Sequence, residues 1–333
     1  MRILLALDTF QLPVRDPRRA GYGGIEAVVW FLAEELIARG HHVAVLASPG
    51  SSVPSGGHLL IHHPSDTADT YHSWIAGADV IHCHDWGRLA QEWAPQFPHK
   101  HFVTTWHGEA TGAPRHVPPN VTVTGVSPWH SQQIHTTHGY PVRNISNGIA
   151  LDAYPLYTGR RETAALFLAR RVPEKGLHLA VDAAQRSQRP LWVAGPLDAK
   201  FHGGAPYLRY MRQRMAALPR GSRDWGEARG RHKVWLLQHA RVTVVPHHTF
   251  SEPFGLWAVE SLACGTPVIG WRRGSIPQVV GSAGMTVTSF AELVRALRDP
   301  PRVSPEACRR QAMRWSARRM AQDAETVYHS QSV

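Results

Sequence analysis

The chain has 333 residues, of which 43% are hydrophobic and 18% charged, and its formal net charge is +11. This length suits two domains of ordinary size, and no apolar stretch reaches the roughly eighteen residues that a membrane-spanning helix needs. The basic balance favours anionic partners such as nucleotide diphosphates, anionic membrane surfaces or nucleic acid, although a solvated basic surface explains it equally well. The three widely spaced cysteines, Cys83, Cys264 and Cys308, disfavour both a disulfide framework and a structural zinc site.

Strand and helix signals alternate through the first half of the chain. Residues 2–7 form an apolar run that predicts a first strand, and after a basic loop Gly23 and Gly24 open a long helix over 25–39. Further apolar runs end in polar residues or glycine and are expected to be strands: 42–47, 59–63, 78–84, 102–108 and 121–127. Strands that alternate with helices predict a parallel sheet covered on both faces.

The pattern is interrupted near residues 150–163, which hold no periodic apolar face and are interpreted as a linker. Strand and helix signals then start afresh, with a helix expected over 206–219 and one or two Arg-rich helices over 305–329, whereas 222–231 looks too charged for a strand. We therefore expect an α/β protein of two doubly wound, Rossmann-like domains that face a central cleft. The expected bounds are 1–152 and 153–312, with 313–333 a terminal helix that could cross back to the first domain.

Residues 243–270 carry the most informative pattern. An apolar run stops at Pro246, a polar loop carries Glu252, and an amphipathic run from Gly255 to Ala263 carries Glu260. This predicts a strand, a loop and a helix whose first backbone N–H groups lie between two acids. Such an arrangement suits a ligand with a phosphate at one end and hydroxyl groups at the other, as in an activated sugar nucleotide.

Six segments, in the same order, resemble the motifs of the family 4 retaining glycosyltransferases, which have the two-domain GT-B fold. The segments are YGGIEAVVWFLAEELIARGHHVAVLA, VIHCHDW, TTWHG, GVSPWHSQQI with NISNGI, FLARRVPEKG and SEPFGLWAVESLACGTPVIG. The last contains two glutamates separated by seven residues, as in that family. The chain departs from the family pattern at Ala169 and Arg171, and it lacks the family's apolar strand around 222–232. It is also short for the family, which suggests trimmed loops around the acceptor.

The resemblance implies a donor site in the second domain. Glu260 would bind the ribose diol, and Glu252 would act as the catalytic residue near the sugar ring. Arg170 and Lys175 would stabilise the diphosphate leaving group. Backbone N–H groups would contact the donor at Phe254, Gly255, Leu256 and Gly24. A simple turn explains Gly255 equally well. A favourable interaction with the helix dipole explains Glu252 as well.

The resemblance also implies an acceptor site in the first domain. His107, at a strand end, would contact the transferred sugar as a second catalytic residue, and Gly23, Glu26 and Asp85 would face the acceptor. Compensation of the helix dipole explains Glu26 equally well, and Asp85 could instead orient a loop. Trp86 and Trp106 lie at strand ends where a ring could stack on a sugar.

Two further expectations concern charge and metal binding. We expect Arg171 to point to solvent, and no metal to be bound. The pairs His62-His63 and His247-His248 are the only metal-like alternatives, and adjacent residues of a strand point to opposite faces.

The predicted function is a retaining, metal-independent glycosyltransferase without a cofactor. It would move a sugar from a UDP- or GDP-type nucleotide sugar to an unidentified acceptor, which could be a saccharide, a small molecule or a lipid-linked molecule. The alternatives are a sugar-nucleotide epimerase of the same fold and a non-enzymatic protein that binds nucleic acid or another polyanion. Nucleic acid is not an expected partner, because no basic motif interleaved with aromatic residues is present. We expect a cytoplasmic protein, and the basic residues 15–19 could meet anionic headgroups if the acceptor is a lipid.

Overall fold

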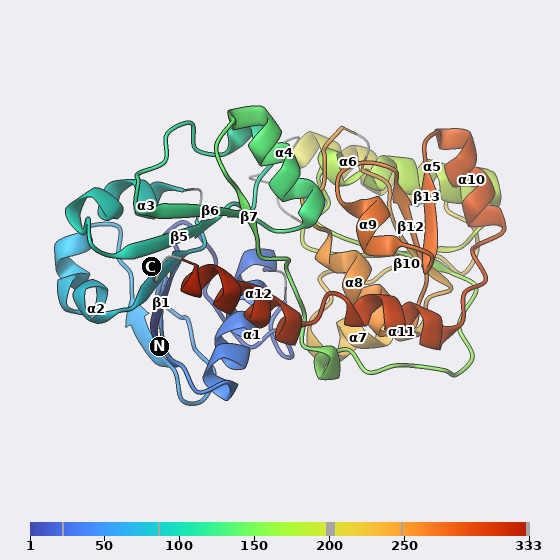
Figure 1. The fold of residues 1–333 in the computed structure, drawn as a ribbon. Coiled ribbons are helices and arrows are strands. Elements are labelled where there is room, and N and C mark those ends of the chain that lie inside the picture. Colours follow the sequence, from blue (N-terminus) through green and yellow to red (C-terminus); the bar gives the residue numbers. More distant parts are fainter. Residues whose placement is uncertain (22, 86, 198–203, 248, 331–333) are drawn as a thin grey trace. The chain divides into compact units, whose positions relative to one another are not determined.

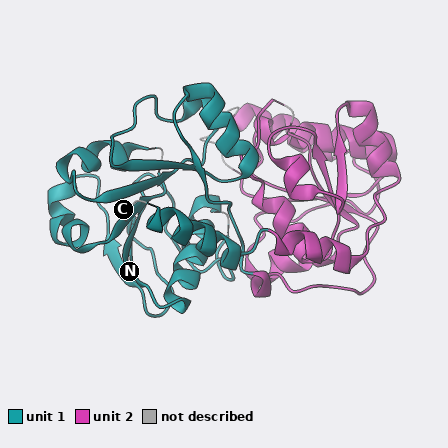
Figure 2. Ribbon diagram, viewed as in Figure 1, with its two compact units in different colours: residues 1–150, 315–333 teal, residues 151–314 magenta. Residues whose placement is uncertain are grey.

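The chain forms two compact units in a computed structural model that describes residues 1–21, 23–85, 87–197, 204–247 and 249–330. Unit 1 comprises residues 1–150 and 315–333, and unit 2 comprises residues 151–314 (Figure 2). The sequence-based boundaries lie after residues 152 and 312.

Unit 1 contains a seven-stranded parallel sheet in its described part, with strand order β3-β2-β1-β4-β5-β6-β7. Its strands are β1 (Arg2–Ala6), β2 (His42–Ala47), β3 (His58–Ile61), β4 (Val80–Cys83), β5 (His101–Thr105), β6 (Val121–Gly125) and β7 (Arg143–Asn144). Its α-helices are α1 (Gly24–Ala38), α2 (His72–Gly77), α3 (Arg88–Trp93), α4 (Pro128–His138) and α12 (Ala317–His329). The central strands β1 and β4 are buried except for Arg2, as expected for a parallel sheet that helices cover on both faces.

The last helix, α12, packs beside α1 although the two come from opposite ends of the chain (Figure 1). Arg39, just after α1, donates two hydrogen bonds to the Glu325 carboxylate, at 2.8 Å through Nε and 2.6 Å through Nη2. A second contact joins the Tyr328 hydroxyl to Nδ1 of the buried His82 at 2.7 Å. The final helix is thus attached to the sheet of unit 1 by polar contacts as well as by packing.

Unit 2 contains a six-stranded parallel sheet in its described part, with strand order β10-β9-β8-β11-β12-β13. The strands are β8 (Ala165–Leu168), β9 (Leu191–Ala194), β10 (Arg223–Asp224), β11 (Val242–Val245), β12 (Val268–Trp271) and β13 (Gly284–Val287). The α-helices are α5 (Leu177–Ser187), α6 (Gly204–Met215), α7 (Gly230–His239), α8 (Leu256–Ala263), α9 (Ile276–Val280), α10 (Phe290–Arg298) and α11 (Pro305–Met313). The two parallel α/β sheets confirm the predicted fold class.

Strand β10 corrects two predictions. It lies in the segment judged too charged for a strand, and it pairs with β9 at the sheet edge. Arg171, expected in solvent, has a side chain only 3% exposed and donates from Nη1 to Asp224 at 2.7 Å and from Nε to the Gly195 carbonyl at 3.1 Å. Arg171 is buried because the Asp224 carboxylate and the surrounding carbonyls replace its hydration.

Both sheets have a point at which the chain order reverses between adjacent strands. In unit 1 it lies between β1 and β4, and in unit 2 between β8 and β11. Ligands of open α/β sheets bind outside the carboxyl ends of the strands at such points. Asp85 follows β4, Lys175 follows β8, and Glu252 lies in the loop after β11, so the topology brings predicted site residues to these positions.

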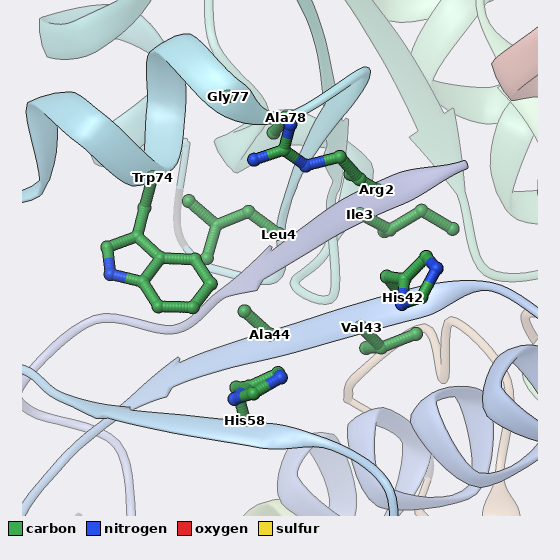
Figure 3. Close-up of a pocket in the computed structure, with 10 residues that line it drawn as sticks. All are labelled: Arg2, Ile3, Leu4, His42, Val43, Ala44, His58, Trp74, Gly77 and Ala78. Atoms are coloured by element: carbon green, nitrogen blue, oxygen red, sulfur yellow. The ribbon is translucent and has the colours of Figure 1, made fainter.

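A pocket of about 350 Å³ lies at the opposite edge of the first sheet, near the beginnings of β1, β2 and β3 (Figure 3). Trp74, Leu4 and Ala44 are among its apolar lining residues, together with Arg2 and His58. The rings of His58 and Trp74 approach each other with 5.8 Å between centroids. None of the predicted site residues lines this pocket.

Candidate active site

The turn after β8 carries the two predicted phosphate-binding cations of unit 2. A short 3₁₀ helix, Pro173–Lys175, is followed by Gly176 with φ of 73°. A Cβ atom at Gly176 would lie 2.4 Å from the carbonyl oxygen of Pro246. Only glycine fits this left-handed position against a backbone carbonyl, so the turn lies directly on the end of β11.

Lys175 and Glu252 form an ion pair at this edge of the sheet. The Lys175 Nζ atom lies 2.7 Å from Glu252 Oε2, and the two side chains are 14% and 11% exposed. The Lys175 ammonium group also lies 4.6 Å from the centroid of the Phe250 ring. The structure therefore brings the predicted leaving-group cation and the predicted catalytic acid into direct contact.

The charges around Glu252 keep its carboxylate ionised. Burial by itself raises the pKa of Glu252, but Lys175, His247 and Arg170 outweigh burial and the pKa is lowered. Burial also lowers the pKa of His247, to about 4, and Glu252 opposes that shift only in part. At neutral pH the site therefore contains an ionised acid and a neutral imidazole, with Arg170 close enough to act on the acid.

Helix α8 begins at Leu256, directly after this acid. Gly255 is the N-cap residue with φ of 93°, a left-handed conformation that favours glycine. Phe254 is 2% exposed and anchors the turn in the core. Because the first N–H groups of a helix lack intrahelical acceptors, this turn directs backbone donors towards the carboxyl edge of the sheet.

Glu260 lies on α8, four residues after the helix begins and hence about 6 Å further along its axis. Glu260 is buried, with 7% of the residue exposed, so it is not an acid on a solvated helix face. Its Oε1 atom accepts hydrogen bonds from the Tyr154 hydroxyl at 2.7 Å and from Lys233 Nζ at 2.6 Å. No hydrogen bond from the described residues to Oε2 is present, so that oxygen can accept further donors.

His107, the catalytic candidate of unit 1, is held by a second histidine. Its Nε2 atom lies 3.2 Å from Nδ1 of His84, whose own Nε2 is buried and has no hydrogen-bond partner among the described residues. If the proton of His84 is on Nδ1, the buried Nε2 is an unpaired acceptor. An unpaired acceptor costs less free energy than the unpaired N–H donor that the other tautomer would bury. We therefore assign the proton of this contact to His84, and the proton of His107 to Nδ1. Burial lowers the pKa of both rings well below the usual value, so both are neutral.

The predicted acceptor residues Asp85 and Glu26 both have backbone partners. Asp85 accepts from the N–H groups of Gly87 and Leu89 at 2.9 and 2.6 Å, which supports the alternative that it orients a loop. Glu26 accepts from the Leu12 N–H at 2.9 Å and lies against Gly23, whose added Cβ would be 3.1 Å from Glu26 Oε2. Burial raises the pKa of Glu26, and burial raises the pKa of Asp85 to about 6.

The remaining expectations concern rings, metals and the basic loop. The Trp106 ring is buried and its Nε1 donates to the Glu109 carbonyl, whereas Trp86 and His248 lie outside the described residues. His62 contacts the Leu7 carbonyl oxygen at 3.0 Å. Among the described residues no group of three or more His, Cys, Asp or Glu side chains could hold a metal ion. In the loop 15–19, Arg18 donates to both oxygens of Glu34, so this cation is engaged within unit 1.

Sequence reasoning missed four residues that complete the site. Three are hydrogen-bond partners of Glu260 and His107, namely Tyr154, Lys233 and His84, and the fourth is His247, whose Nε2 lies 3.9 Å from Glu252 Oε2. His84 and His247 stand at strand ends, and that position is a signal that could have identified them. Lys233 and Tyr154 belong to no recognisable motif, and only their place in the fold shows their role.

Comparisons with known proteins agree with this architecture. Residues 159–299 match the family model "Glycosyl transferases group 1". The D-rhamnosyltransferase WbpZ of Pseudomonas aeruginosa is 26% identical over 355 aligned positions, which cover 92% of this chain and 87% of that protein. The chain also superimposes on AviGT4, a glycosyltransferase involved in avilamycin A biosynthesis, with a TM-score of 0.75, 25% identity, and coverage of 98% of this chain and 96% of AviGT4.

A second similar structure is that of Anabaena HepE in complex with UDP-glucose. Its TM-score is 0.73 at 16% identity, with 98% of this chain and 99% of HepE covered. The two parallel α/β units and these neighbours define a protein of the GT-B fold. Together with the group 1 match over most of unit 2, they identify the chain as a glycosyltransferase, an enzyme that transfers a sugar. Within the described residues, no helix combines the length and the apolar character required to span a bilayer.

Proposed function

We propose that the chain is a retaining glycosyltransferase that takes its sugar from a nucleoside-diphosphate sugar. The observation that carries this proposal is the contact of 2.7 Å between Lys175 and Glu252. In a sugar nucleotide the diphosphate is bonded directly to the anomeric carbon, so a cation for phosphate and an acid for a sugar hydroxyl must lie within a few ångströms of each other. HepE, a neighbour of the same fold, was solved with UDP-glucose.

Each end of such a donor has a matching group in unit 2. Lys175 and Arg170 would stabilise the negative charge that develops on the diphosphate as the glycosidic bond breaks. Glu252, kept ionised by these cations, would accept a hydrogen bond from a sugar hydroxyl and stabilise positive charge at the anomeric carbon. The N–H groups at the start of α8 suit a phosphate or sugar oxygen. Glu260 Oε2 would accept from the ribose hydroxyls while Oε1 stays bonded to Lys233.

We propose a step in which the acceptor attacks on the face that the diphosphate leaves, so that the anomeric configuration is retained. The contact that the structure shows for the Glu252 carboxylate is with the Lys175 cation. Retaining glycosidases instead use two carboxyl groups about 5–5.5 Å apart for double displacement, and we do not propose that arrangement here. The two cations would serve the leaving group without a metal ion. In unit 1, His107 with its proton on Nδ1 would donate to a hydroxyl of the transferred sugar.

The test is a binding and turnover assay of the purified protein with a panel of UDP- and GDP-sugars. Glu260→Ala and Lys175→Ala should each weaken nucleotide binding, whereas Arg209→Ala, an exposed change on α6, should not. The anomeric configuration of the product, read by NMR, tests retention. Failure of every sugar nucleotide to bind, or binding to both variants as tight as to the wild type, would contradict the proposal. An altered sugar nucleotide formed without any acceptor would identify an epimerase instead.

The acceptor is proposed to be a saccharide, a small molecule or a lipid-linked molecule. A lipid acceptor would bring residues 15–19 close to headgroups, and Arg15 and Arg19 are the cations left there once Arg18 is paired with Glu34. Co-sedimentation with anionic liposomes at low salt tests this contact. A protein that stays in the supernatant would remove the membrane role.

A further inference from the structure

A second pocket of unit 2 lies away from the residues described above. It has a volume of about 280 Å³. Its lining comes from the segments that precede three strands of the sheet, from the loop before α11 and from the first residue of α11: Gly159, Arg160, Arg161, Arg241, Gly265, Pro267, Pro301, Val303 and Pro305. Arg241 directly precedes β11, and Pro267 directly precedes β12. The pocket therefore opens at the amino-terminal edge of the sheet.

The described residues that line this pocket include three arginines and no acid. Arg161 is held in place, since its Nε donates to Thr266 Oγ1 at 3.1 Å and its Nη2 donates to the Tyr157 carbonyl at 2.9 Å. By contrast, the guanidinium groups of Arg160 and Arg241 make no hydrogen bond or ion pair with residues that the structure describes. Two cations without partners thus lie beside a third that is fixed to the fold.

Arg241 is close enough to Arg161 and to Arg189 to affect their charges. Burial lowers the pKa of Arg161, and the charge of Arg241 lowers it further. Burial and Arg241 have the same effect on the pKa of Arg189, which lies outside the lining. Mutual repulsion of these like charges is unfavourable, and a bound anion would relieve that repulsion.

We propose that this pocket is a second anion site of unit 2 and that it binds a small phosphorylated molecule. Guanidinium groups bind phosphate through paired N–H donors, and several arginines around one pocket suit an anion with more than one charge. Three prolines and Val303 provide an apolar wall for the rest of the ligand. The volume is at the lower limit for small-molecule sites, so pyrophosphate or a sugar phosphate fits better than a larger ligand.

This site is distinct from the donor site proposed above. Arg170 and Lys175 follow the carboxyl end of β8, whereas Arg160 and Arg161 precede its amino end. A strand of four residues spans about 13 Å, so one small anion cannot reach both groups. A ligand in the arginine pocket would act on the stability or motion of unit 2 rather than on the reacting bond.

The test uses pyrophosphate as the probe and the full chain as the protein, by isothermal titration at low ionic strength. The pocket variant is Arg160→Gln with Arg241→Gln, which removes two charges without breaking a side-chain hydrogen bond to the described residues. The matched control is Arg209→Gln with Arg212→Gln, two exposed positions on α6. Lys175→Met reports on the donor site, and calorimetric unfolding shows whether each variant is folded.

We expect the wild type and the control to bind two pyrophosphates, and the pocket variant and Lys175→Met to bind one each. The affinity of the arginine pocket should fall about tenfold or more for each charge-assisted hydrogen bond that is lost. A folded pocket variant that binds pyrophosphate with the stoichiometry and Kd of the control would overturn the inference. A single wild-type site that is lost in the pocket variant but kept in Lys175→Met would support the inference and contradict the phosphate role of Lys175.

Discussion

Replacement of Lys175 by Met tests the central ion pair of unit 2. Loss of one partner from a fully buried ion pair costs about 3–5 kcal/mol, because the remaining charge is left without compensation. Lys175 and Glu252 are 14% and 11% exposed, and Arg170 still acts on Glu252, so we expect a smaller loss of about 2–3 kcal/mol. His247 adds little at neutral pH because its pKa is about 4. For a unit of this size the thermal midpoint should fall by about 5–10 °C in scanning calorimetry.

A double variant, Lys175→Met with Glu252→Gln, separates lost charge pairing from lost packing. Removal of both charges leaves no buried ion without a partner, so the double variant should be more stable than Lys175→Met alone. The pH dependence has a defined sign. In the wild type the pKa of Glu252 is lowered, so its carboxylate stabilises the fold until the pH falls through that pKa. In Lys175→Met we expect burial to raise the pKa of Glu252, so protonation of Glu252 in acid should relieve the destabilisation. The reasoning is refuted if Lys175→Met melts at the wild-type temperature, or if the double variant melts at a lower temperature than Lys175→Met.

Three further predictions concern contacts outside this pair. Arg171→Met should destabilise unit 2 by about 2 kcal/mol and speed amide exchange in β10, because buried carbonyls lose their hydrogen-bond donor. Asp224→Asn should have a smaller effect, because the Asp224 side chain is 48% exposed. Tyr328→Phe leaves His82 Nδ1 without this partner and should cost about 1–3 kcal/mol, measured by calorimetry; a change below about 0.5 kcal/mol would contradict it. The partners of Glu325 lower its pKa to about 2. At pH values above the ordinary pKa of a glutamate, ionised Glu325 should therefore stabilise α12, and this stabilisation should disappear as the pH falls towards 2. Amide exchange in α12 reports that loss, and Glu325→Gln should abolish the pH dependence.

The sequence by itself determined the alternation of strands and helices, and with it the fold class. Apolar runs that end in polar residues identify buried parallel strands and their carboxyl ends, because the period of side chains in a strand or helix is a local property of the chain. The same local signals located Lys175 after one strand, Glu252 in the loop after another and Glu260 on the helix that follows. The segment 222–231 escaped these signals because a two-residue edge strand has no apolar pattern.

Only the tertiary structure decided which charged side chains meet. Arg171 is buried because Asp224, 53 positions along the chain, lies beside it in the folded sheet. Lys233 reaches Glu260 from a different helix, and the arginines of the second anion pocket come from segments that precede separate strands. Parallel strands bring such segments together through crossover connections, and no local period in the sequence records those contacts.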